Sequence, residues 1–510
     1  MTFDLSIPSQ LMQALTPDLV LMGGAMLLML AAAWRPDSDG HQRAVGYAAM
    51  GLLLVTLVLV LWFAQRGLSS GPGVIAVDEF RFASDALFLL AALGAIALGI
   101  EYNGRERIWN AESHVLVLFA TSGMMILAAA RDLMIVFLGI EMMSVAVYVL
   151  VGMNRRSPRS AEGALKYFLL GAFSTGFLLY GIALVYGATG STNLTTIGER
   201  IVQYQLAHQP MLLVGIGLLM VGFGFKVAAV PFHMWAPDVY EGAPTPITAF
   251  MAAAVKAAAF AAFLRVWRES FDLLDFAWLV PLAWLAAATM VFGNVVALSQ
   301  RNVKRLLAYS SIVHSGYLLL AVAAGAPSGT AAFLFYLLAY TLATFGAFAV
   351  VCAMSRPGDR DLEISDYEGL WLVRPGLAVG MAVCMFALLG FPVFGGAGFF
   401  AKVYVVAAAH ASPFRNLVPL TVLLVLASVI SAGYYLQIVR VMFMKPRPEG
   451  ANDPAPVGPL TRVVLGVSVA LVLLVGLVPA RVVTWARDSQ AAPPKVVVAP
   501  PKTLNTATAP

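Results

Sequence analysis

Residues 211–235 read MLLVGIGLLMVGFGFKVAAVPFHMW, an apolar run that is interrupted by one lysine, Lys226, and one proline, Pro231. A helix needs about 20 apolar residues to cross the roughly 30 Å of hydrocarbon in a bilayer, and this run is long enough. Pro231 cannot donate a backbone hydrogen bond, so the carbonyl of Val227 loses its helical partner. The stretch therefore predicts a transmembrane helix, near residues 211–232, that is broken beside a buried charge.

The whole chain has the composition of a membrane protein. Of its 510 residues, 60% are hydrophobic and only 12% are charged, whereas soluble domains carry about a quarter charged residues. The sequence leaves no room for a sizeable soluble domain. We expect an all-α polytopic membrane protein of about fourteen transmembrane helices. The apolar runs lie at residues 17–34, 44–64, 84–101, 113–130, 132–152, 163–188, 211–232, 245–267, 276–298, 305–325, 330–353, 376–410, 415–440 and 460–479.

The twelfth apolar run, residues 376–410, is too long for one straight crossing. Its segment 390–398 contains Pro392 and several glycines, which remove a donor and lower helix propensity. We therefore expect discontinuous helices at the seventh and the twelfth crossing.

An internal repeat is expected to organise the chain. Two regions each hold five apolar runs, and each contains a Pro/Gly-interrupted run that bears a lysine, Lys226 or Lys402. Because five is odd, the two copies would have opposite orientations in the membrane. The predicted divisions are 1–112 for helices 1–3, 113–267 for the first repeat, 268–304 for the ninth helix and its loop, counted with the second repeat, 305–440 for the remainder of that repeat, 441–483 for the last helix, and 484–510 for a disordered tail rich in Pro and Ala.

Lysine and arginine are unevenly distributed between the loops on the two sides. The richer side includes Arg155, Arg156, Arg159, Arg301 and Lys304, and the positive-inside rule assigns it to the cytoplasm. An even number of helices then places both termini on the non-cytoplasmic side. The first 18 residues contain no Lys or Arg, so we expect the first apolar run to be retained rather than cleaved as a signal peptide.

Few residues of the sequence could hold a cofactor. Cys352 and Cys384 are the only cysteines, and both fall inside apolar runs, where we expect them to be packing residues. Two cysteines and six histidines cannot provide a Cys-ligated iron–sulfur cluster, and no two histidines have metal-ligand spacing on one helix. We expect no cofactor and no metal in this chain, and no nucleic-acid partner.

Four ionisable residues lie deep within apolar runs: Glu141, Lys226, Lys256 and Lys402. Each costs about 2.5–3.5 kcal/mol or more if it is charged at the bilayer centre, which favours a functional role. Burial favours a neutral lysine, whereas a nearby carboxylate favours the ammonium form. A Glu141–Lys226 pair whose separation changes would therefore take up and release a proton. The alternatives are a structural ion pair and a helix kink that only aids packing.

His314 lies in a hydroxyl-rich run with Tyr309, Ser310, Ser311 and Tyr317 nearby, which could hold a water wire. The hypothesis is that His314 relays protons; the alternative is a histidine that only packs in the core.

Lys166, near the start of the sixth run, is a further candidate for proton transfer, with an interfacial anchor as the alternative. His233, Asp238 and Glu241 follow the Pro231 break, and we expect them to cap the loop rather than to carry protons.

Several of these motifs resemble the antiporter-like membrane subunits shared by respiratory complex I and Mrp-type cation/proton antiporters. The segments are GIEMMS at 139–144, FKVAAVPFHMWAPDVYEGAP at 225–244 and KRLLAYSSIVH at 304–314, which are similar to the family's fifth-, seventh- and tenth-helix signatures. Within the family, LKYFLLGAFS at 165–174 and the Tyr/Gly pattern up to Gly190 are most similar to the subunit N branch. Lys402 in place of a glutamate fits this branch better than subunit M, and the long lateral helix of subunit L is missing. The resemblance covers residues 10–480.

The resemblance implies a proton-translocating subunit in the membrane arm of NADH:quinone oxidoreductase, in the bacterial inner membrane. It implies proton handling at Glu141, Lys226, Lys256 and Lys402. NAD, FMN, iron–sulfur clusters and quinone would be bound by other subunits, and the neighbours would be the antiporter-like subunit M and the small subunit K. Three other functions remain open: an Mrp-type antiporter subunit, which shares every motif except the subunit N stretch, a transporter of an organic solute, and a static scaffold.

Overall fold

The computed structural model describes residues 6–66, 73–325, 327–359, 362–393, 396–412, 416–449, 454 and 456–489. Within these ranges the chain is built from helices, and β-structure is limited to three isolated bridges. The helices are α1 (Ser6–Ala33), α2 (Asp39–Ala64), α3 (Glu79–Glu106), α4 (Glu112–Ala129), α5 (Leu133–Val151), α6 (Pro158–Thr189), α7 (Leu194–Gln203), α8 (Pro210–Lys226), α9 (Ala236–Gly242), α10 (Thr245–Phe250), α11 (Lys256–Ser270), α12 (Asp275–Ala297), α13 (Val303–Ala324), α14 (Ser328–Met354), α15 (Leu370–Val373), α16 (Pro375–Leu389), α17 (Gly396–His410), α18 (Val418–Met444), α19 (Pro459–Leu477) and α20 (Pro479–Asp488). Of the predicted tail, residues 484–510, the part from residue 490 onward lies outside the described ranges.

In the described part of the chain, twelve helices are long and apolar enough to cross a membrane. One of them joins α10 and α11 through a π-helical turn, Met251–Val255. Three shorter apolar helices, α8, α16 and α17, complete the set. The prediction of an all-helical, multi-pass membrane protein is confirmed.

Polar residues fix where several helices begin. Asp78 accepts a hydrogen bond from the backbone N–H of Arg81, Asp132 accepts one from Met134, and Asn302 accepts one from Arg305. Each cap satisfies a backbone donor that the first turn of a helix leaves free. The helix boundaries therefore follow from short polar segments between long apolar runs.

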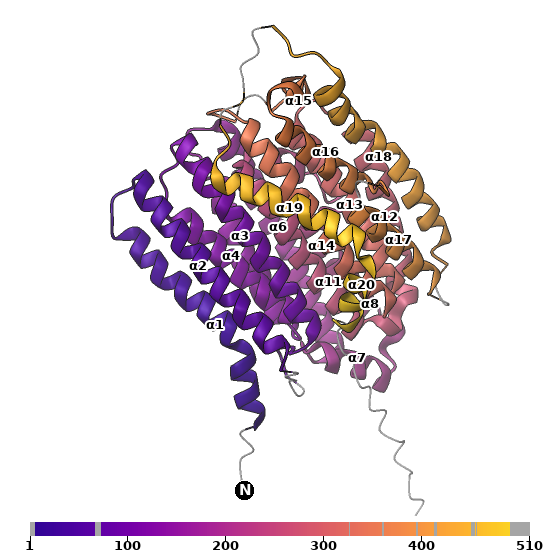
Figure 1. Ribbon diagram of the computed structural model, residues 1–510. Helices are drawn as coiled ribbons and strands as arrows, with labels where there is room; N and C mark the ends of the chain where they lie inside the picture. Colours follow the sequence, from indigo (N-terminus) through magenta and orange to yellow (C-terminus); the bar gives the residue numbers. More distant parts are fainter. Residues whose placement is uncertain are drawn as a thin grey trace, which may run out of the picture.

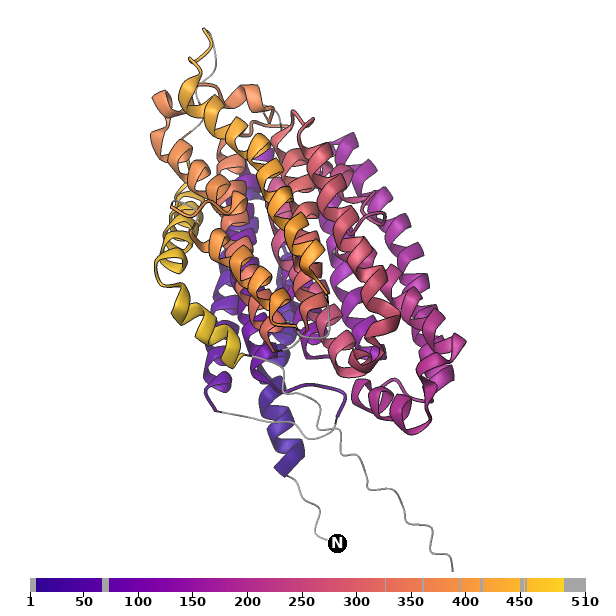
Figure 2. The same cartoon turned by 90° about the vertical axis from the view of Figure 1, so that its right-hand side faces the viewer.

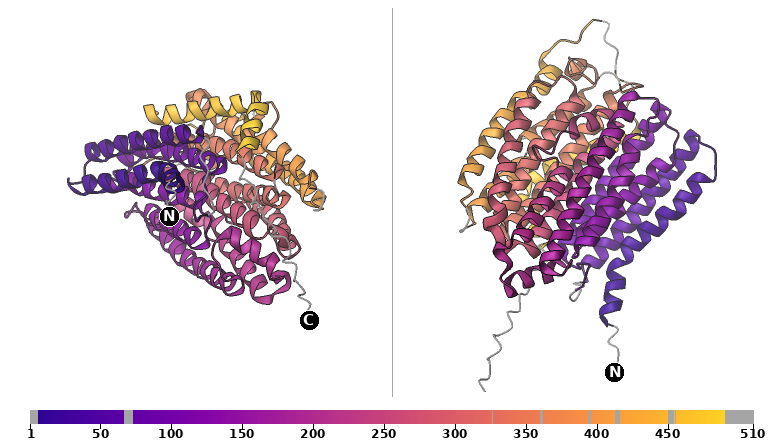
Figure 3. Two further views of the ribbon diagram at one scale, coloured as in Figure 1. Left: turned by 90° about the horizontal axis from the view of Figure 1, so that it is seen from below. Right: turned by 180° about the vertical axis from the view of Figure 1, so that it is seen from behind.

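The helices differ in how much of their surface is covered by protein. The spans formed by α13 and by α10 with α11 are buried on all sides, and α3, α4 and α14 are mostly buried. In contrast, no more than about a third of each of the spans α1, α2, α12, α18 and α19 is buried within the protein, as expected of helices that face lipid. Figures 1 and 3 show α1 and α2 at one edge of the bundle and α18 at the opposite edge.

Helix α19 lies obliquely across the outside of the bundle and contacts α3, α14, α16 and α17 (Figures 1 and 2). Glu101 of α3 holds its first turn: its carboxylate accepts the N–H of Leu460 at 2.8 Å, the N–H of Thr461 at 3.1 Å and the hydroxyl of Thr461. One turn further on, Arg105 donates to the carbonyl of Cys352 at 2.6 Å, near the end of α14. Helix α3 therefore fixes the end of α14 and the start of α19.

Candidate functional site

Lys226 is the last residue of α8, and its side chain is buried. Its Nζ donates to Ser144 Oγ at 2.7 Å and lies 3.5 Å from the hydroxyl of Tyr148. Ser144 and Tyr148 are on the face of α5 that also carries Glu141, because residues three and four apart lie together on a helix. The amine is therefore held by hydroxyl groups one turn from a carboxylate.

Glu141 accepts a hydrogen bond from Thr175 Oγ1 of α6 at 2.9 Å. Its side chain is half-buried, and the neighbouring Val145 on the same helix is exposed. Within the described ranges the printed partners of Glu141 and Lys226 are hydroxyl groups, and no ion pair joins the two side chains. Of the two charges predicted to form the switch, Lys226 is therefore bound by Ser144 and Tyr148, and Glu141 is bound by Thr175.

Beyond Lys226 the chain is not helical until Ala236, and side chains of other helices satisfy the exposed backbone. Ser315 Oγ of α13 donates to the carbonyl of Val227 at 2.7 Å. Thr289 Oγ1 of α12 accepts the N–H of Val230 at 2.9 Å. The carbonyl that Pro231 was predicted to free is therefore bound by a hydroxyl group.

Lys256 follows directly on the π-turn Met251–Val255 and is buried. Its Nζ donates to both the carbonyl and the hydroxyl oxygen of Ser311 on α13, each at 2.8 Å. A π-turn inserts an extra residue into a helical turn and is frequent at functional sites. Here it determines the direction from which Lys256 reaches α13.

His314 lies one turn beyond Ser311 on α13, and its ring is enclosed by tyrosines. Nδ1 is 2.5 Å from the hydroxyl of Tyr336, and Nε2 is 3.2 Å from that of Tyr435. Tyr435 in turn shares a short hydrogen bond with Ser310. The hydroxyl-rich surroundings that the sequence indicated for His314 are present.

Lys402 of α17 is buried at the end of α16. Its Nζ donates to the carbonyl of Leu389 at 2.7 Å and to Ser428 Oγ of α18 at 3.0 Å. It also lies 4.9 Å from the ring centre of Tyr317. A cation is favoured there because the last carbonyls of a helix carry partial negative charge. A cavity of about 10 Å³, the size of one water, lies between Lys402 and His314.

Helix α13 contacts the segments that carry the three buried lysines. Ser315 binds the carbonyl of Val227, beside Lys226, and also that of Ser311, which holds Lys256. We call the residues Glu141, Ser144, Lys226, Ser315, Ser311, Lys256, His314 and Lys402 the central polar series. It runs from α5 to α17 through the most deeply buried helices of the bundle.

Lys166 lies outside the central polar series. Its Nζ pairs with Glu162 at 2.6 Å and with Asp238 at 2.8 Å, and the side chain is partly exposed. Asp238 and Glu241 both bind Arg305, so each pairs with a cation. Burial alone would raise the pKa of Asp238, but its bonds to Lys166 and Arg305 hold that pKa below the ordinary value.

Sequence reasoning missed the hydroxyl groups that connect the series, among them Ser144, Thr175 and Ser315. It also missed a buried cluster of charges formed by Asp18, Arg81 and Asp85 near the start of α3. A serine in an apolar helix carries no signal of its partner. The aspartates lie near the ends of apolar runs, where a charge is ordinarily attributed to the membrane surface.

Both cysteines are buried and free, as expected of packing residues. Within the ranges that the structure describes, no three His, Cys, Asp or Glu side chains come together in a way that could hold a metal ion.

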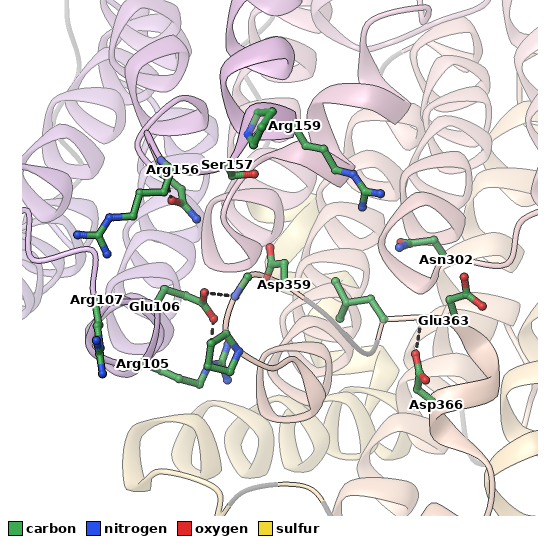
Figure 4. Close-up of a pocket in the computed structure, with 15 residues that line it drawn as sticks. Arg105, Glu106, Arg107, Arg156, Ser157, Arg159, Asn302, Asp359, Glu363 and Asp366 are labelled. Atoms are coloured by element: carbon green, nitrogen blue, oxygen red, sulfur yellow. Dashed lines mark hydrogen bonds and ion pairs between the residues drawn. The ribbon is translucent and has the colours of Figure 1, made fainter. Parts of the chain in front are cut away.

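A polar pocket of about 1040 Å³ opens where α3 ends and α6 begins (Figure 4). Arginine and carboxylate side chains line it, among them Arg105, Glu106, Arg107, Arg156, Arg159, Asp359, Glu363 and Asp366. Asp359 binds the buried Nζ of Lys304 at 2.9 Å, and Lys304 also donates to the carbonyl of Ala243. The pocket thus reaches an ion pair at the start of α13.

Comparisons with known proteins agree with this arrangement. The family model described as NADH:quinone oxidoreductase/Mrp antiporter, TM, matches residues 130–431. The chain is 49% identical to an NADH-quinone oxidoreductase subunit N of Gemmatimonas aurantiaca, over 94% of this chain and 93% of that protein. It is similar to a chain of respiratory complex I from Thermus thermophilus, with 37% identity, a TM-score of 0.77 and coverage of 92% and 99%. A chain of the Mrp complex from Dietzia sp. has the same fold at 20% identity, with a TM-score of 0.83 and coverage of 96% and 98%.

Proposed function

Because this chain belongs to the NADH:quinone oxidoreductase/Mrp antiporter family of membrane subunits, and within it to subunit N of NADH-quinone oxidoreductase, we propose that its central polar series carries protons across the membrane. Electron transfer from NADH to quinone would take place in other subunits, which would hold the NAD, FMN, iron–sulfur clusters and quinone. This chain would use the energy of that reaction to pump protons.

The observation that supports the proposal most is that α13 contacts the segments that bear all three buried lysines of the central polar series. Lys226, Lys256 and Lys402 come from three different apolar helices, yet each is hydrogen-bonded to oxygen atoms and each lies against α13 or its neighbours. Their bonding partners are hydroxyl and carbonyl oxygens, so a proton on one lysine is not locked in a tight ion pair. A subunit with only a structural role would not need three such amines in the hydrocarbon region of the membrane.

The helix breaks support a repeated architecture. We infer fourteen crossings, in which α8 with α9 and α16 with α17 form the discontinuous seventh and twelfth helices. The two inverted five-helix repeats would be residues 113–267 and 268–440, each with one break. Lys226 directly precedes the first break and Lys402 follows the second. Interrupted helices in corresponding positions of two halves are where transporters place their ion sites.

The polar pocket supports proton entry from the face that the Lys/Arg distribution assigns to the cytoplasm. Its Asp359–Lys304 pair lies at the start of α13, seven residues before Ser311 on the same helix. Seven residues correspond to about 10 Å of helix. Protons would enter at this pair and reach Lys256 along α13.

The assembly follows from the family. We expect this chain to lie in the bacterial inner membrane between the antiporter-like subunit M and the small subunit K, with both termini on the non-cytoplasmic side. The alternative of an Mrp-type cation/proton antiporter subunit shares the family model and the fold, but the 49% identity favours subunit N. Co-purification with redox subunits supports the first function, whereas a chain that exchanges cations without a redox partner would establish the second.

The test of proton transport is to replace Lys226 in the assembled complex. Lys226→Ala should lower proton uptake by vesicles to background during quinone reduction, and Lys226→Arg should not restore it. Arginine keeps the positive charge, but with a pKa above about 12 it cannot release a proton at working pH. Lys445→Arg is the control, because Lys445 is an exposed partner of Glu368 at 2.6 Å and lies outside the series.

Native gels must show that each variant assembles, so that lost complex is not mistaken for lost transport. If Lys226→Arg assembles and pumps normally, Lys226 carries no proton and the proposed route is wrong at its centre.

A further inference from the structure

A second group of buried charges lies outside the central polar series, between α1 and α3. Arg81 of α3 donates to Asp18 of α1, and its Nε lies 3.4 Å from Asp85, one turn further along α3. The side chains of Arg81, Asp18 and Asp85 are 0%, 4% and 1% exposed. Two carboxyl groups therefore surround a single guanidinium where water cannot screen them.

The charges next to this group are balanced. Arg265 of α11 binds Asp78 through two hydrogen bonds, at 2.8 and 2.9 Å, and binds Glu269 at 2.9 Å. Arg131 lies 3.9 Å from Asp78 and 3.3 Å from Glu269. Burial alone would raise the pKa of Asp78, but Arg265 and Arg131 hold it below the ordinary value. These two carboxylates and two guanidiniums neutralise each other.

The excess negative charge therefore belongs to Asp18 and Asp85. Within the described ranges, neither oxygen of Asp85 and only one oxygen of Asp18 has a hydrogen-bond partner. The hydroxyl of the adjacent Ser84 is also buried and without a partner there. An ionised carboxylate needs hydrogen bonds or opposite charge to remain in an apolar interior, and without them it is neutralised.

We propose that Asp18 and Asp85 hold one proton between them beside Arg81, which makes this cluster a proton-binding site separate from the central polar series. Two nearby carboxyl groups share one proton because they cannot both ionise at little cost, and the proton belongs to the pair. A hard metal cation would instead require several more oxygen ligands than the two carboxyl groups provide.

The position of the site suggests its place in the protein. Asp85 is seven residues inside α3 from Asp78, a depth of about 10 Å, near the face where α1 and α3 begin. That face is the one predicted to be non-cytoplasmic. Helix α11 starts at Lys256 and reaches the adjacent, balanced group of charges at Arg265 and Glu269. The proposal rests on two buried carboxyl groups beside one guanidinium and not on proton transport. The site can therefore be tested independently of the proposed function.

Infrared difference spectroscopy of the purified complex tests the proposal directly. A protonated buried carboxyl group has a carbonyl band that an ionised carboxylate lacks, and the band shifts in D₂O. Wild type should show this band, and Asp85→Asn and Asp18→Asn should each lose it, because either change leaves one carboxylate for one guanidinium. Glu79→Gln is the control, since it removes a partly exposed carboxylate at the start of the same helix and should leave the band unchanged.

Assembly gives a second readout. Each single Asn variant should assemble to the wild-type level, whereas the double variant leaves Arg81 without a carboxylate and should lower the amount of complex severalfold. Identical spectra of wild type and both single variants would overturn the proposal. So would a band that appears only after Na⁺ is removed, because the site would then hold Na⁺ in place of the proton.

Discussion

The amine of Lys226 donates to the hydroxyl of Ser144, one turn along α5 from Glu141. A neighbouring carboxylate was predictable from the sequence, because both charges stand in apolar runs. The hydroxyl that binds the amine was not predictable, because a serine at residue 144 in an apolar helix is unremarkable and its partner lies 82 residues away. At this scale the sequence identifies the ionisable groups and the structure supplies the distances between them.

Ser144→Ala should therefore impair coupled proton uptake without preventing assembly. A hydrogen bond to a charged group contributes about 1.5–3 kcal/mol, so its loss should slow coupled turnover by about tenfold or more. Proton uptake in vesicles, normalised to assembled complex, is the measurement. Ser122→Ala is the control, because Ser122 binds only a carbonyl of its own helix, α4. Equal turnover in the two variants would mean that Ser144 does not position Lys226.

At the scale of single elements, the break after α8 shows how far sequence reasoning reaches. Pro231 predicted the interruption and the free carbonyl of Val227. Ser315, which binds that carbonyl, lies 88 residues further on in α13, and no local pattern connects the two. The π-turn before Lys256 was missed as well, because the sequence of α10 and α11 reads as one regular apolar helix.

Ser315→Ala should destabilise the protein because it leaves the carbonyl of Val227 without its partner. A buried polar group that loses its hydrogen bond costs about 1–3 kcal/mol. The expected result is a lower Tm of the purified complex. Thr121→Val should have a smaller effect, since Thr121 binds a carbonyl within its own helix. An unchanged Tm for Ser315→Ala would show that another group satisfies the break.

A second prediction about a single helix concerns Glu101, which caps α19 from a neighbouring helix. Glu101→Ala removes the acceptor of two backbone N–H groups and one hydroxyl. Loss of a cap costs about 0.5–2 kcal/mol. We expect faster proteolysis of the segment before α19 and a lower Tm. Thr461→Ala removes only the hydroxyl bond and should have a smaller effect. If it lowers the Tm as much as Glu101→Ala does, the bonds to the two backbone N–H groups contribute nothing.

For the whole molecule, the sequence specifies which segments are helices but not how they are arranged. Apolar runs set the lengths of most helices, but α1 begins at Ser6, well before the predicted run at 17–34, and α8 ends at Lys226, before the predicted end at 232. The oblique path of α19 over α14 and back to α3 depends on contacts between residues more than 300 positions apart, such as Glu101 with Leu460. The sequence also does not show which side of a helix faces lipid, because apolar residues occur on every face of most helices.

The predicted orientation in the membrane can be tested with reporter fusions. A fusion after Arg159 should report the cytoplasm, and a fusion at the C-terminus should report the opposite side, because positive charge gathers in the loop before α6. Reporters active on only one side of the membrane give the measurement, and exchanging the two reporters is the control. A cytoplasmic C-terminus would reverse the direction of proton entry proposed for the polar pocket.

The π-turn that precedes Lys256 also gives α10 and α11 a capacity for internal rotation. Such a turn holds one surplus residue, and shifting that surplus by one position along a helix rotates all side chains between its old and new places by about 100°. Passing it beyond Lys256 would swing the amine away from Ser311 while both ends stay anchored, by Lys304 at the carbonyl of Ala243 before α10 and by Arg265 at Asp78. The lysine could then face two sides in turn by a change within one helix, and no neighbouring helix would have to tilt.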